Sequence, residues 1–531
     1  MPNAERSAPV LAWNFSAPLL PAQLHLHAQL CRELNLTAVS GRLLIRRGME
    51  SLSAAQNFLS RRFDLLHDPA LLPDIDRAVQ RIAKAVDKGE SILLFGDYDA
   101  DGITATALLH RFFNVLKRSR ARSTFTVNSC VPDRKDGYGL TPASVAMIKR
   151  LKPDLLITLD NGISAHGALD CLHESGIETI VVDHHHLQGE LPKAVAVINP
   201  KRPDSAYPFD ELCGAGISFK LAWALAVHFS QNKKVTPEFK SFLLDAVALA
   251  GIGTIADVVP LLDENRVLAH QGLAALNKTG MPGLRALMET ATLKGPAKAF
   301  DVSFRIAPRL NAAGRCGDVS EALELLMTED PARATRLATL LNDCNTERQA
   351  LQKRIAEEAR EQALRILESA PHSRAFVLSS DAWHHGIIGI VASRIVEEFH
   401  RPAFLLSIDK DTQLARGSGR SVRGFHLAEA LGKQHALLLT HGGHAAAAGL
   451  SLLSRNIDAF SAAFHSTATQ MLLGRDLSPQ LGLDERMTLP QVSQKFCTEL
   501  EMLEPFGMGN PRPTLCVSGA SISSCLLYTS D

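Results

Sequence analysis

The sequence predicts an α/β protein in which two α/β domains are joined by a long helix and followed by a partial β domain. Three observations lead to this prediction. Short apolar runs alternate with helical patterns from about 75 to 260, and a second alternation covers 371–468. Between them, 331–370 is charged and almost free of glycine. Repeated strand–helix–strand units are typical of a mainly parallel sheet with helices on both faces.

The overall composition fits a multidomain globular protein without a membrane anchor. A chain of 531 residues is too long for one core and predicts about three or four domains. Its 56 basic residues balance 56 acidic ones, so no net charge points to a nucleic acid, although a local groove can still be basic. Nine cysteines without a CxxC pair argue against zinc ribbons and disulfides, and favour a reducing cytoplasm. We expect neither a signal peptide nor a membrane span.

The chain divides into five segments by pattern. Residues 1–74 form a helical lead-in, where leucines at 26, 30 and 34 recur at helical spacing. The first α/β domain covers 75–330, the connecting helix 331–370 and the second α/β domain 371–468. The remainder, 469–531, is β-rich but short for a five-stranded oligonucleotide-binding (OB) barrel. Its last stretch, SCLLYTSD, continues no pattern, so we expect a truncated domain or a foreign tail.

The most informative stretch is SILLFGDYDADGIT, at 91–104. An apolar run predicts a buried strand, and Asp97, Asp99 and Asp101 follow it directly. Three carboxylates at alternate positions repel one another, which favours a bound cation, and a divalent metal with oxygen ligands is the simplest one. The alternative is a solvated acidic turn in which Asp101 or Thr104 caps the next helix.

Polar residues also follow later strands of the same domain. Asp160 follows LLIT, and Asp183, His184 and His185 follow TIVV. Asp257 lies in the apolar stretch GTIADVVPL, where it needs a cation or a helix to cap. Ligands of parallel α/β sheets bind beyond the carboxyl ends of the strands, so these residues should share one crevice. Several carboxylates with one or two imidazoles suit a pair of Mn²⁺ or Mg²⁺ ions better than zinc.

Three further segments point to phosphate binding. SFRIAPRLNAAGRCGD places Arg305, Arg309 and Arg315 among small residues, which lets a phosphate approach closely. GSGR reads as a turn between a strand and a helix, where backbone N–H groups and Arg420 could form a phosphate nest. His444, in GGHAAAAG, strengthens this interpretation.

These motifs resemble a known family. DYDADG, LDNG, VDHHH and GTIADVVPL are similar to the successive motifs of the DHH phosphoesterase superfamily. RLNAAGR, WHHGIIGIVASR, ARGSGRS and GGHAAAAG resemble those of its RecJ branch, the single-stranded-DNA-specific exonucleases. The resemblance runs from about Ile75 to Asn510 in the order of the family. It implies a DHH domain at 75–330, a smaller DHHA1 domain at 371–468 and a partial OB-like domain at 469–531.

The resemblance also implies a set of metal ligands. These are Asp99, Asp101, Asp160, His184 and Asp257, with Asp160 bridging two Mn²⁺ or Mg²⁺ ions. Many relatives outside the branch have a histidine where this sequence has Phe95, so one metal has fewer protein ligands here. We expect Asp183 to orient the His184 ring without binding the metal itself.

The remaining roles concern the substrate. The resemblance places His185 next to the scissile phosphate and Arg309 on a phosphate across the cleft. Ser418, Gly419 and Arg420 would hold the terminal 5′-phosphate, and His444 would line the same groove. Of the aromatic residues, Tyr138 is the better candidate for contacting the strand, whereas Trp383 serves packing or stacking.

The expected function is a metal-dependent exonuclease that degrades single-stranded DNA from its 5′ end to mononucleotides, in DNA repair and recombination. Two ions about 3.5–4 Å apart activate the attacking water and stabilise the leaving alkoxide. A groove between the α/β domains would admit one strand and exclude a duplex. The expected enzyme is a cytoplasmic monomer without a membrane partner, supplied by a single-strand-binding protein and a helicase.

Two alternative functions are also compatible with the sequence. One is a DHH-type phosphoesterase for short oligoribonucleotides or for cyclic or linear dinucleotides, which chain length disfavours. The other is a scaffold that keeps the fold and has lost catalysis, which the complete set of carboxylates disfavours.

Overall fold

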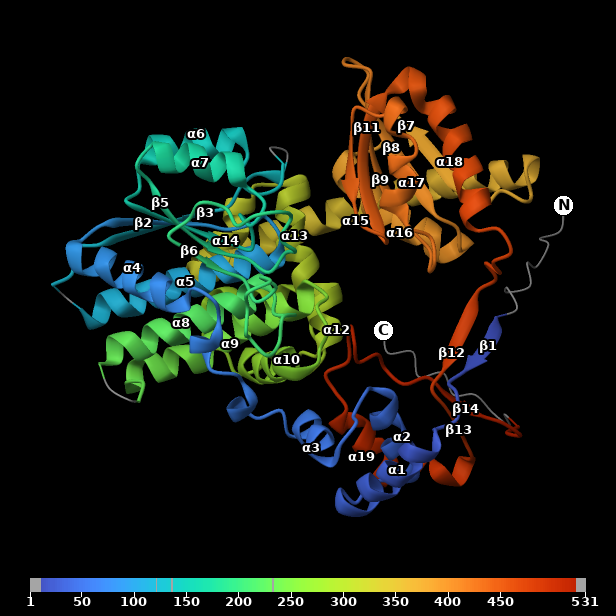
Figure 1. Cartoon of the computed structure of the whole chain (residues 1–531), viewed down its shortest axis with the longest axis horizontal. Helices are drawn as coiled ribbons and strands as arrows, with labels where there is room; N and C mark the ends of the chain where they lie inside the picture. Colours follow the sequence, from blue (N-terminus) through green and yellow to red (C-terminus); the bar gives the residue numbers. More distant parts are fainter. Residues whose placement is uncertain (1–10, 121, 135–136, 232–233, 522–531) are drawn as a thin grey trace. The chain divides into compact units, whose positions relative to one another are not determined.

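The computed structural model describes residues 11–120, 122–134, 137–231 and 234–521 (Figure 1). The chain folds into two compact units. Of the described residues, those within 15–344 and 483–521 form the large unit, and those within 11–14 and 345–482 form the small unit. The expectation of a foreign tail concerns residues that lie outside the described ranges.

The core of the large unit is a five-stranded parallel sheet with strand order β3-β2-β4-β5-β6. The strands are β2 (Ser91–Phe95), β3 (Thr126–Cys130), β4 (Leu155–Leu159), β5 (Glu178–Val182) and β6 (Ala196–Ile198). The chain moves from β2 to β3 on one side and then returns to β4 on the other. The topological switch point, where such sheets bind ligands, therefore lies between β2 and β4.

Helices cover both faces of this sheet (Figure 1). One face packs on α4 (Ile75–Lys88), α5 (Ala100–Ser119) and α8 (Gly214–Ser230), and the other on α6 (Pro142–Leu151) and α7 (His166–Glu174). Successive residues of β2 alternate between these two cores: Ile92 and Leu94 face the first, and Leu93 and Phe95 face the second. Strands buried on both faces read as continuous apolar runs, as the sequence predicted.

A helical layer follows the sheet in sequence. It comprises α9 (Pro237–Ala256), α10 (Asp263–Leu276), α11 (Pro282–Thr290), α12 (Ala299–Asp301), a π-helical turn (Val302–Ile306), α13 (Ala307–Cys316) and α14 (Val319–Met327). Within the described residues, α9 is the one helix long and apolar enough to cross a membrane. Two thirds of its apolar window are buried inside the unit, which is also the pattern of a core helix. Gly251 of α9 packs directly against Gly272 of α10, so the two backbones approach closely.

The helical lead-in packs against the C-terminal segment of the large unit. The lead-in comprises α1 (Pro21–Glu33), α2 (Ala38–Arg46) and α3 (Leu52–Ser60), and the C-terminal elements are β13 (Glu485–Met487), α19 (Gln494–Met502) and β14 (Leu515–Val517). Two further strands, β1 (Ala12–Phe15) and β12 (Gln480–Leu483), belong almost entirely to the small unit. Phe496 and Leu503 share a hydrophobic core with Leu30 and Leu43. β1 pairs with β12, and β13 pairs in parallel with β14.

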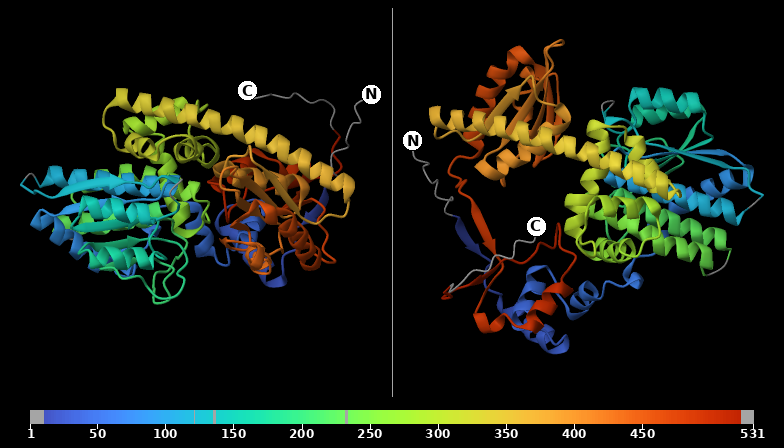
Figure 2. Two further views of the ribbon diagram at one scale, coloured as in Figure 1. Left: turned by 90° about the horizontal axis from the view of Figure 1, so that it is seen from above. Right: turned by 180° about the vertical axis from the view of Figure 1, so that it is seen from behind.

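The predicted connecting helix is α15 (Pro331–Ser369), whose 39 residues reach about 60 Å (Figure 2). It begins in the large unit and ends in the small one. Its last turns pack on the small unit, where Ile355, Ala359 and Ala363 join the core of Ile387 and Val391.

The small unit is built on a mixed sheet of order β10-β11-β9-β8-β7, in which only β7 and β8 are parallel. Its elements are β7 (Phe376–Ser380), α16 (His385–Phe399), β8 (Ala403–Ile408), β9 (Leu414–Arg420), α17 (Leu427–Gly432), β10 (Thr440–Gly443), β11 (Ala447–Leu453) and α18 (Ile457–Met471). The prediction of a GSGR turn is wrong: 417–420 is the end of β9, paired on both sides with β8 and β11. Its backbone N–H groups enter these ladders and do not form a nest.

Candidate metal centre

Seven acidic and histidine residues converge at the carboxyl ends of β2, β4 and β5 and at the end of α9. Three overlapping groups have ligand atoms within 4.8 Å of one another: Asp97, Asp99 and Asp160; Asp101, His184 and Asp257; and Asp160, His184 and His185. The structure therefore brings together the six residues predicted for this site and adds Asp97. The position is the switch point of the sheet.

The loop after β2 is fixed by the first turn of α5. Asp99 is the N-cap of this helix, and its Oδ1 accepts hydrogen bonds from the N–H groups of Asp101 at 2.9 Å and Gly102 at 3.1 Å. The alternative of a solvated acidic turn is wrong, because Asp97 and Asp101 are buried and the residue that caps the helix is Asp99, not Asp101 or Thr104. A β-carbon at position 102 would lie 2.5 Å from the backbone nitrogen of Asp97, so only glycine allows this approach.

Asp101 is held by the N-terminus of α8. Its two carboxylate oxygens accept hydrogen bonds from the N–H groups of Gly214 at 2.6 Å and Ala215 at 2.9 Å. A helix N-terminus stabilises negative charge, which fixes this carboxylate in place. A β-carbon at Gly214 would lie 2.6 Å from Cβ of Asp160, so the absence of a side chain lets Asp101 and Asp160 approach each other.

Asp160 adopts a strained backbone conformation. Its φ of 63° lies in the left-handed region, which typically costs a non-glycine residue about 1–3 kcal/mol. The backbone N–H of Asp160 donates to the carbonyl of Val182, and its carbonyl accepts from the hydroxyl of Tyr138 at 3.0 Å. These contacts hold the carboxylate at the end of β4.

Several buried polar atoms of the centre lack a hydrogen-bond partner among the described residues. They are Oδ1 of Asp97, Oδ1 of Asp160, and both ring nitrogens of His184. His184 Nε2 lies 3.1 Å from Oδ1 of Asp160 and 3.6 Å from Oδ2 of Asp257. The contact between His184 and Asp160 is short, but the two atoms do not form a hydrogen bond with each other. Buried polar atoms without a hydrogen-bond partner destabilise a folded protein. These oxygen and nitrogen atoms are suited to binding a shared cation instead.

Burial and mutual repulsion shift the pKa values of the centre. Burial, together with the neighbouring carboxylates, raises the pKa of Asp97 and of Asp257 to about 8. Burial and the adjacent carboxylates also hold the pKa of Asp160 well above its usual value. Burial lowers the pKa of His184 to about 4, so this ring is neutral at pH 7 and can act as a ligand. Without a cation, such carboxylates would take up protons instead.

Asp183 orients His185, which corrects the expectation that it orients His184. Oδ1 of Asp183 accepts a hydrogen bond from Nδ1 of His185 at 2.7 Å, whereas it contacts His184 only through the backbone N–H at 2.7 Å. Burial opposes charge on His185, but the Asp183 contact prevails and raises its pKa. The His185 side chain is 45% exposed, so it faces the open side of the centre.

Two tyrosines and an arginine border the centre. The Tyr138 hydroxyl lies 3.2 Å from Nδ1 of His185, and its ring is 52% exposed. The Tyr98 ring meets that of Tyr138 edge-on at 6.4 Å, and the Arg134 guanidinium lies 4.6 Å from the centre of the Tyr98 ring. Tyr138 was predicted from the sequence, whereas Tyr98, which lies within the DYDADG motif, and Arg134 were not.

Arg309 lies on α13, outside the three groups of candidate ligands. Its Nη2 donates to Oδ1 of Asn342 at 3.0 Å, and its Nη1 donates to the carbonyl of Arg305 at 2.6 Å. The same helix reaches the centre through Asn311, whose Oδ1 accepts from the N–H of Ala100 at 2.7 Å. The RLNAAGR segment thus supports the loop that carries the aspartates.

The other predicted phosphate ligands lie in the small unit. Arg420 donates from Nη1 to Oγ of Ser418 at 3.1 Å, and burial lowers its pKa. A β-carbon at Gly389 of α16 would lie 2.9 Å from Oγ of Ser418 and 3.3 Å from Nη2 of Arg420, so α16 packs closely on this pair. Gly419 is buried beside them, and His444 is exposed in the turn after β10. Within this unit, Ser418, Gly419 and Arg420 form one group on β9.

Trp383 serves packing. Its side chain is 3% exposed within the core of the small unit. Its Nε1 donates to Oε2 of Glu358 at 2.7 Å. The stacking alternative for this residue is therefore wrong.

Comparisons with known proteins agree with this architecture. The DHH family N-terminal domain model matches residues 91–251, the DHHA1 domain model 372–470 and the RecJ OB domain model 483–530. The single-stranded-DNA-specific exonuclease RecJ of Bacillus subtilis is 36% identical over 92% of this chain, which spans 60% of that relative. The RecJ of Dickeya dadantii is 37% identical over 90% of this chain and 83% of its own length.

A solved structure gives the same result for the fold. The crystal structure of RecJ from Thermus thermophilus in complex with Mn²⁺ matches 95% of this chain and 69% of its own with a TM-score of 0.79 and 32% identity. The predicted fold class, two α/β domains followed by an OB domain, is confirmed. The chain belongs to the RecJ family of single-stranded-DNA-specific exonucleases.

Proposed function

We propose that this chain is a metal-dependent hydrolase that degrades single-stranded DNA from its 5′ end to mononucleotides. The observation that carries the proposal is the cluster of buried carboxylates around His184, whose orphaned oxygen and nitrogen atoms converge on common points. Relatives of this chain are named single-stranded-DNA-specific exonucleases, and solved RecJ structures contain Mn²⁺ or Mg²⁺.

The candidate ligands divide between two metal positions. Asp97, Asp99 and Asp160 form one group, and Asp101, His184 and Asp257 form the other. Asp160 lies between them, because its Oδ1 is also 3.1 Å from His184 Nε2, which suits a bridging carboxylate. When bound, a pair of Mn²⁺ or Mg²⁺ ions would acidify a water and stabilise the leaving oxygen. Oxygen-rich sites of this kind favour these metals over zinc.

The residues around the metal positions have separate tasks. His185, with a raised pKa and an Asp183 partner, is placed to carry a positive charge toward a phosphate on the open side of the centre. The exposed ring of Tyr138 offers a surface for a base or sugar. We assign Ser418, Gly419 and Arg420 to the terminal 5′-phosphate, with His444 and Arg309 as further backbone contacts. Arg420 and Ser418 are already linked, so the guanidinium is pre-oriented.

The domain assignment follows the expected division. We assign 1–74 to a helical lead-in, 75–330 to the DHH domain, 331–370 to the connecting helix, 371–468 to the DHHA1 domain and 469–531 to the OB-like domain. The proposed setting is DNA repair and recombination in the cytoplasm, with a monomeric enzyme that receives its strand from a helicase and a single-strand-binding protein.

The direct test is a time course on a single-stranded oligonucleotide labelled at its 3′ end, with Mn²⁺, Mg²⁺ or chelator. We expect a ladder that shortens from the 5′ end, needs metal and is absent on the blunt duplex. Asp101→Asn should abolish the ladder, while Arg365→Gln, an exposed change on α15, should leave it intact. Preference for a dinucleotide over the long strand would contradict the proposal and favour the small-substrate phosphoesterase.

A further inference from the structure

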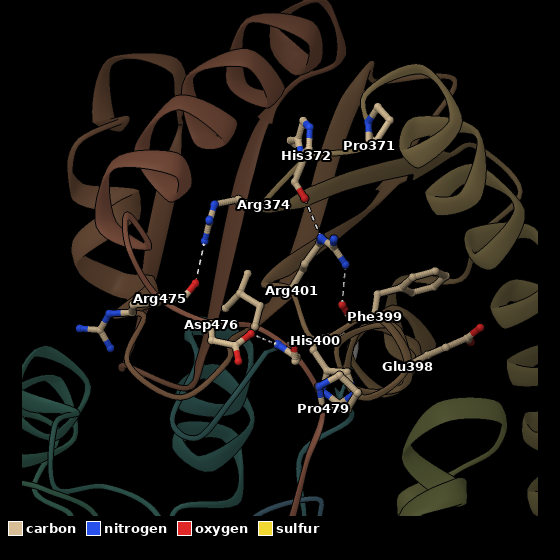
Figure 3. A pocket seen from close by; sticks show the side chains of 13 residues that line it. Pro371, His372, Arg374, Glu398, Phe399, His400, Arg401, Arg475, Asp476 and Pro479 are labelled. Carbon is tan, nitrogen blue, oxygen red and sulfur yellow. Dashed lines mark hydrogen bonds between the residues drawn. The ribbon is translucent and has the colours of Figure 1, made fainter. Parts of the chain in front are cut away.

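A second cationic site lies in the small unit, at the end of α16 farthest from Ser418 and Arg420. A pocket of about 480 Å³ is formed there by the segments 371–374, 398–401 and 475–479 (Figure 3). Arg374, Arg401 and Arg475 line it, together with His372 and His400. We call it the arginine pocket.

The arginines of this pocket have no carboxylate partner among the described residues, and Arg374 and Arg401 donate to backbone carbonyls. Arg374 donates to the carbonyls of Leu472 at 2.9 Å and Arg475 at 3.1 Å, beyond the C-terminus of α18. Arg401 donates to the carbonyl of Ser373 at 2.6 Å, ahead of β7, and to that of Phe399, the last residue of α16, at 2.8 Å. These bonds fix both guanidinium groups, and the Nη2 atom of each has no hydrogen-bond acceptor in the described part of the chain.

The two fixed guanidinium groups repel each other. Burial lowers the pKa of Arg401, and the nearby charge of Arg374 lowers it further. In Figure 3, Arg374 extends toward Arg475 and Arg401 toward Phe399, with Asp476 and His400 below them. Uncompensated like charges held together by the fold favour the binding of an anion.

The acidic residues at the rim are engaged elsewhere. Glu398 pairs with Arg360 of α15, and Asp476 accepts a hydrogen bond from the N–H of Ser478 at 2.8 Å. Neither carboxylate forms an ion pair with the three arginines within the described part of the chain. Arg374 and Arg401 therefore remain without a carboxylate partner there, while the guanidinium group of Arg475 lies against Gly424.

The size and walls of the pocket suit a nucleotide. Phe399, Leu477, Pro371 and Pro479 supply an apolar wall beside the arginines. Ligand sites for small molecules typically enclose about 300–1,000 Å³, which fits a single nucleotide. Guanidinium groups bind phosphate oxygens with paired donors, and a base or sugar would cover the apolar wall.

We propose that the arginine pocket binds the phosphate group of a single nucleotide. The site is separate from the proposed 5′-phosphate group on β9. Gly389, which packs on Ser418 and Arg420, lies about 15 Å along α16 from Phe399, by the helical rise. None of the pocket residues belongs to the metal centre, so this proposal stands independently of the nuclease activity.

The test is isothermal titration of the full chain, in chelator, with dTMP, inorganic phosphate and thymidine. We expect saturable binding of dTMP and weaker binding of phosphate, with none of thymidine. Arg401→Gln should weaken dTMP binding about tenfold, and the matched exposed change Arg365→Gln should not. Binding should persist in Arg420→Gln, which removes the proposed 5′-phosphate ligand.

Arg401→Gln also removes the hydrogen bond to the last carbonyl of α16, so it could weaken binding by disturbing the fold. A second pair of variants avoids this effect. Ser478→Glu adds a negative charge at the rim without removing any capping bond, and Ser478→Gln is its neutral match of similar size. We expect the glutamate variant to weaken dTMP binding about tenfold and the glutamine variant to bind normally, with equal unfolding temperatures. Absence of saturable binding, or unchanged binding in Arg401→Gln and Ser478→Glu, would overturn the site. Equal affinity for phosphate and dTMP would overturn its assignment to a nucleotide.

Discussion

The Asp183 carboxylate accepts a hydrogen bond from Nδ1 of His185 at 2.7 Å, whereas Nε2 of the His184 ring lies 3.1 Å from the Asp160 carboxylate. The two adjacent histidines therefore face different surroundings. His184 is buried and neutral beside Asp160 and Asp257, whereas His185 is partly exposed and its pKa is raised by Asp183. The first is suited to a metal and the second to a phosphate.

Asp183→Asn should therefore affect turnover and not metal binding. We expect kcat on single-stranded DNA to fall about 10–100-fold, because the His185 ring loses its anionic partner. Mn²⁺ affinity, measured by calorimetry, should stay within about twofold. His184→Gln should instead lower the affinity for Mn²⁺, because it removes a proposed metal ligand. Equal loss of Mn²⁺ affinity in both variants would contradict the separation of roles.

Gly214→Ala should damage the centre through packing alone. The added methyl group would lie 2.6 Å from Cβ of Asp160 and 3.0 Å from Oδ2 of Asp101, so these carboxylates must shift. We expect a loss of about 1–3 kcal/mol in the free energy of unfolding, measured in urea, and weaker Mn²⁺ binding. Gly216→Ala is the control, because its methyl group would meet only ordinary contacts at 3.4 Å or more. Similar behaviour of the two variants would refute this account of the close approach.

The stability of the metal-free protein should fall as pH rises from 6.5 to 9. Asp97 and Asp257 have folded pKa values near 8, well above the usual 3.8, so the folded state holds protons that the unfolded state releases. Their contribution is complete at low pH and is lost as pH passes about 8. The lowered pKa of His184 acts in the opposite direction only between about 4 and 6.5.

Thermal unfolding in chelator and in Mn²⁺ measures this effect. The increase in Tm on adding Mn²⁺ should be larger at pH 8.5 than at pH 6.5, since metal replaces protons on the carboxylates. The double variant Asp97→Asn, Asp257→Asn should flatten the pH dependence in chelator. A metal-free Tm that does not fall across this range would contradict the raised pKa values of the two carboxylates.

Arg266 should stabilise the junction between α10 and the C-terminal segment. This buried guanidinium donates to the carbonyls of Phe58 at 2.7 Å, Leu503 at 3.0 Å and Glu504 at 3.0 Å. Arg266→Lys keeps the charge but cannot reach several carbonyls at once, so we expect a loss of about 3 kcal/mol in the free energy of unfolding. Arg285→Lys, on the exposed side of α11, should change it by less than about 0.5 kcal/mol. Equal stability of both variants would contradict the role of Arg266.

The sequence predicted those parts of the site that depend on local pattern. Apolar runs followed by aspartates identify β2 and β4 with Asp97, Asp99, Asp101 and Asp160, because parallel strands bring their carboxyl ends to one edge. What it could not predict depends on side-chain direction. The partner of Asp183 is decided by backbone geometry after β5, which places the ring of His185, and not that of His184, on the carboxylate.

Pairing between distant segments could not be predicted from the sequence either. GSGR has the composition of a turn, yet it forms the end of β9 because β8 and β11 pair with it on both sides. Tertiary context overrides local propensity in such strands. Likewise, nothing in the helical spacing of Leu26, Leu30 and Leu34 shows that the lead-in packs on α19, more than 400 positions away, as the Thr37–Glu499 hydrogen bonds demonstrate.

The central claim is that the carboxylates around His184 form a metal centre that cleaves single-stranded DNA. The most direct measurement is Mn²⁺ binding and strand cleavage on the same samples of wild type, Asp160→Asn and the exposed control Asp210→Asn. We expect wild type and Asp210→Asn to bind about two ions and to shorten the strand. Asp160→Asn should lose cleavage and at least one ion. Full metal binding with wild-type cleavage in Asp160→Asn would contradict the claim.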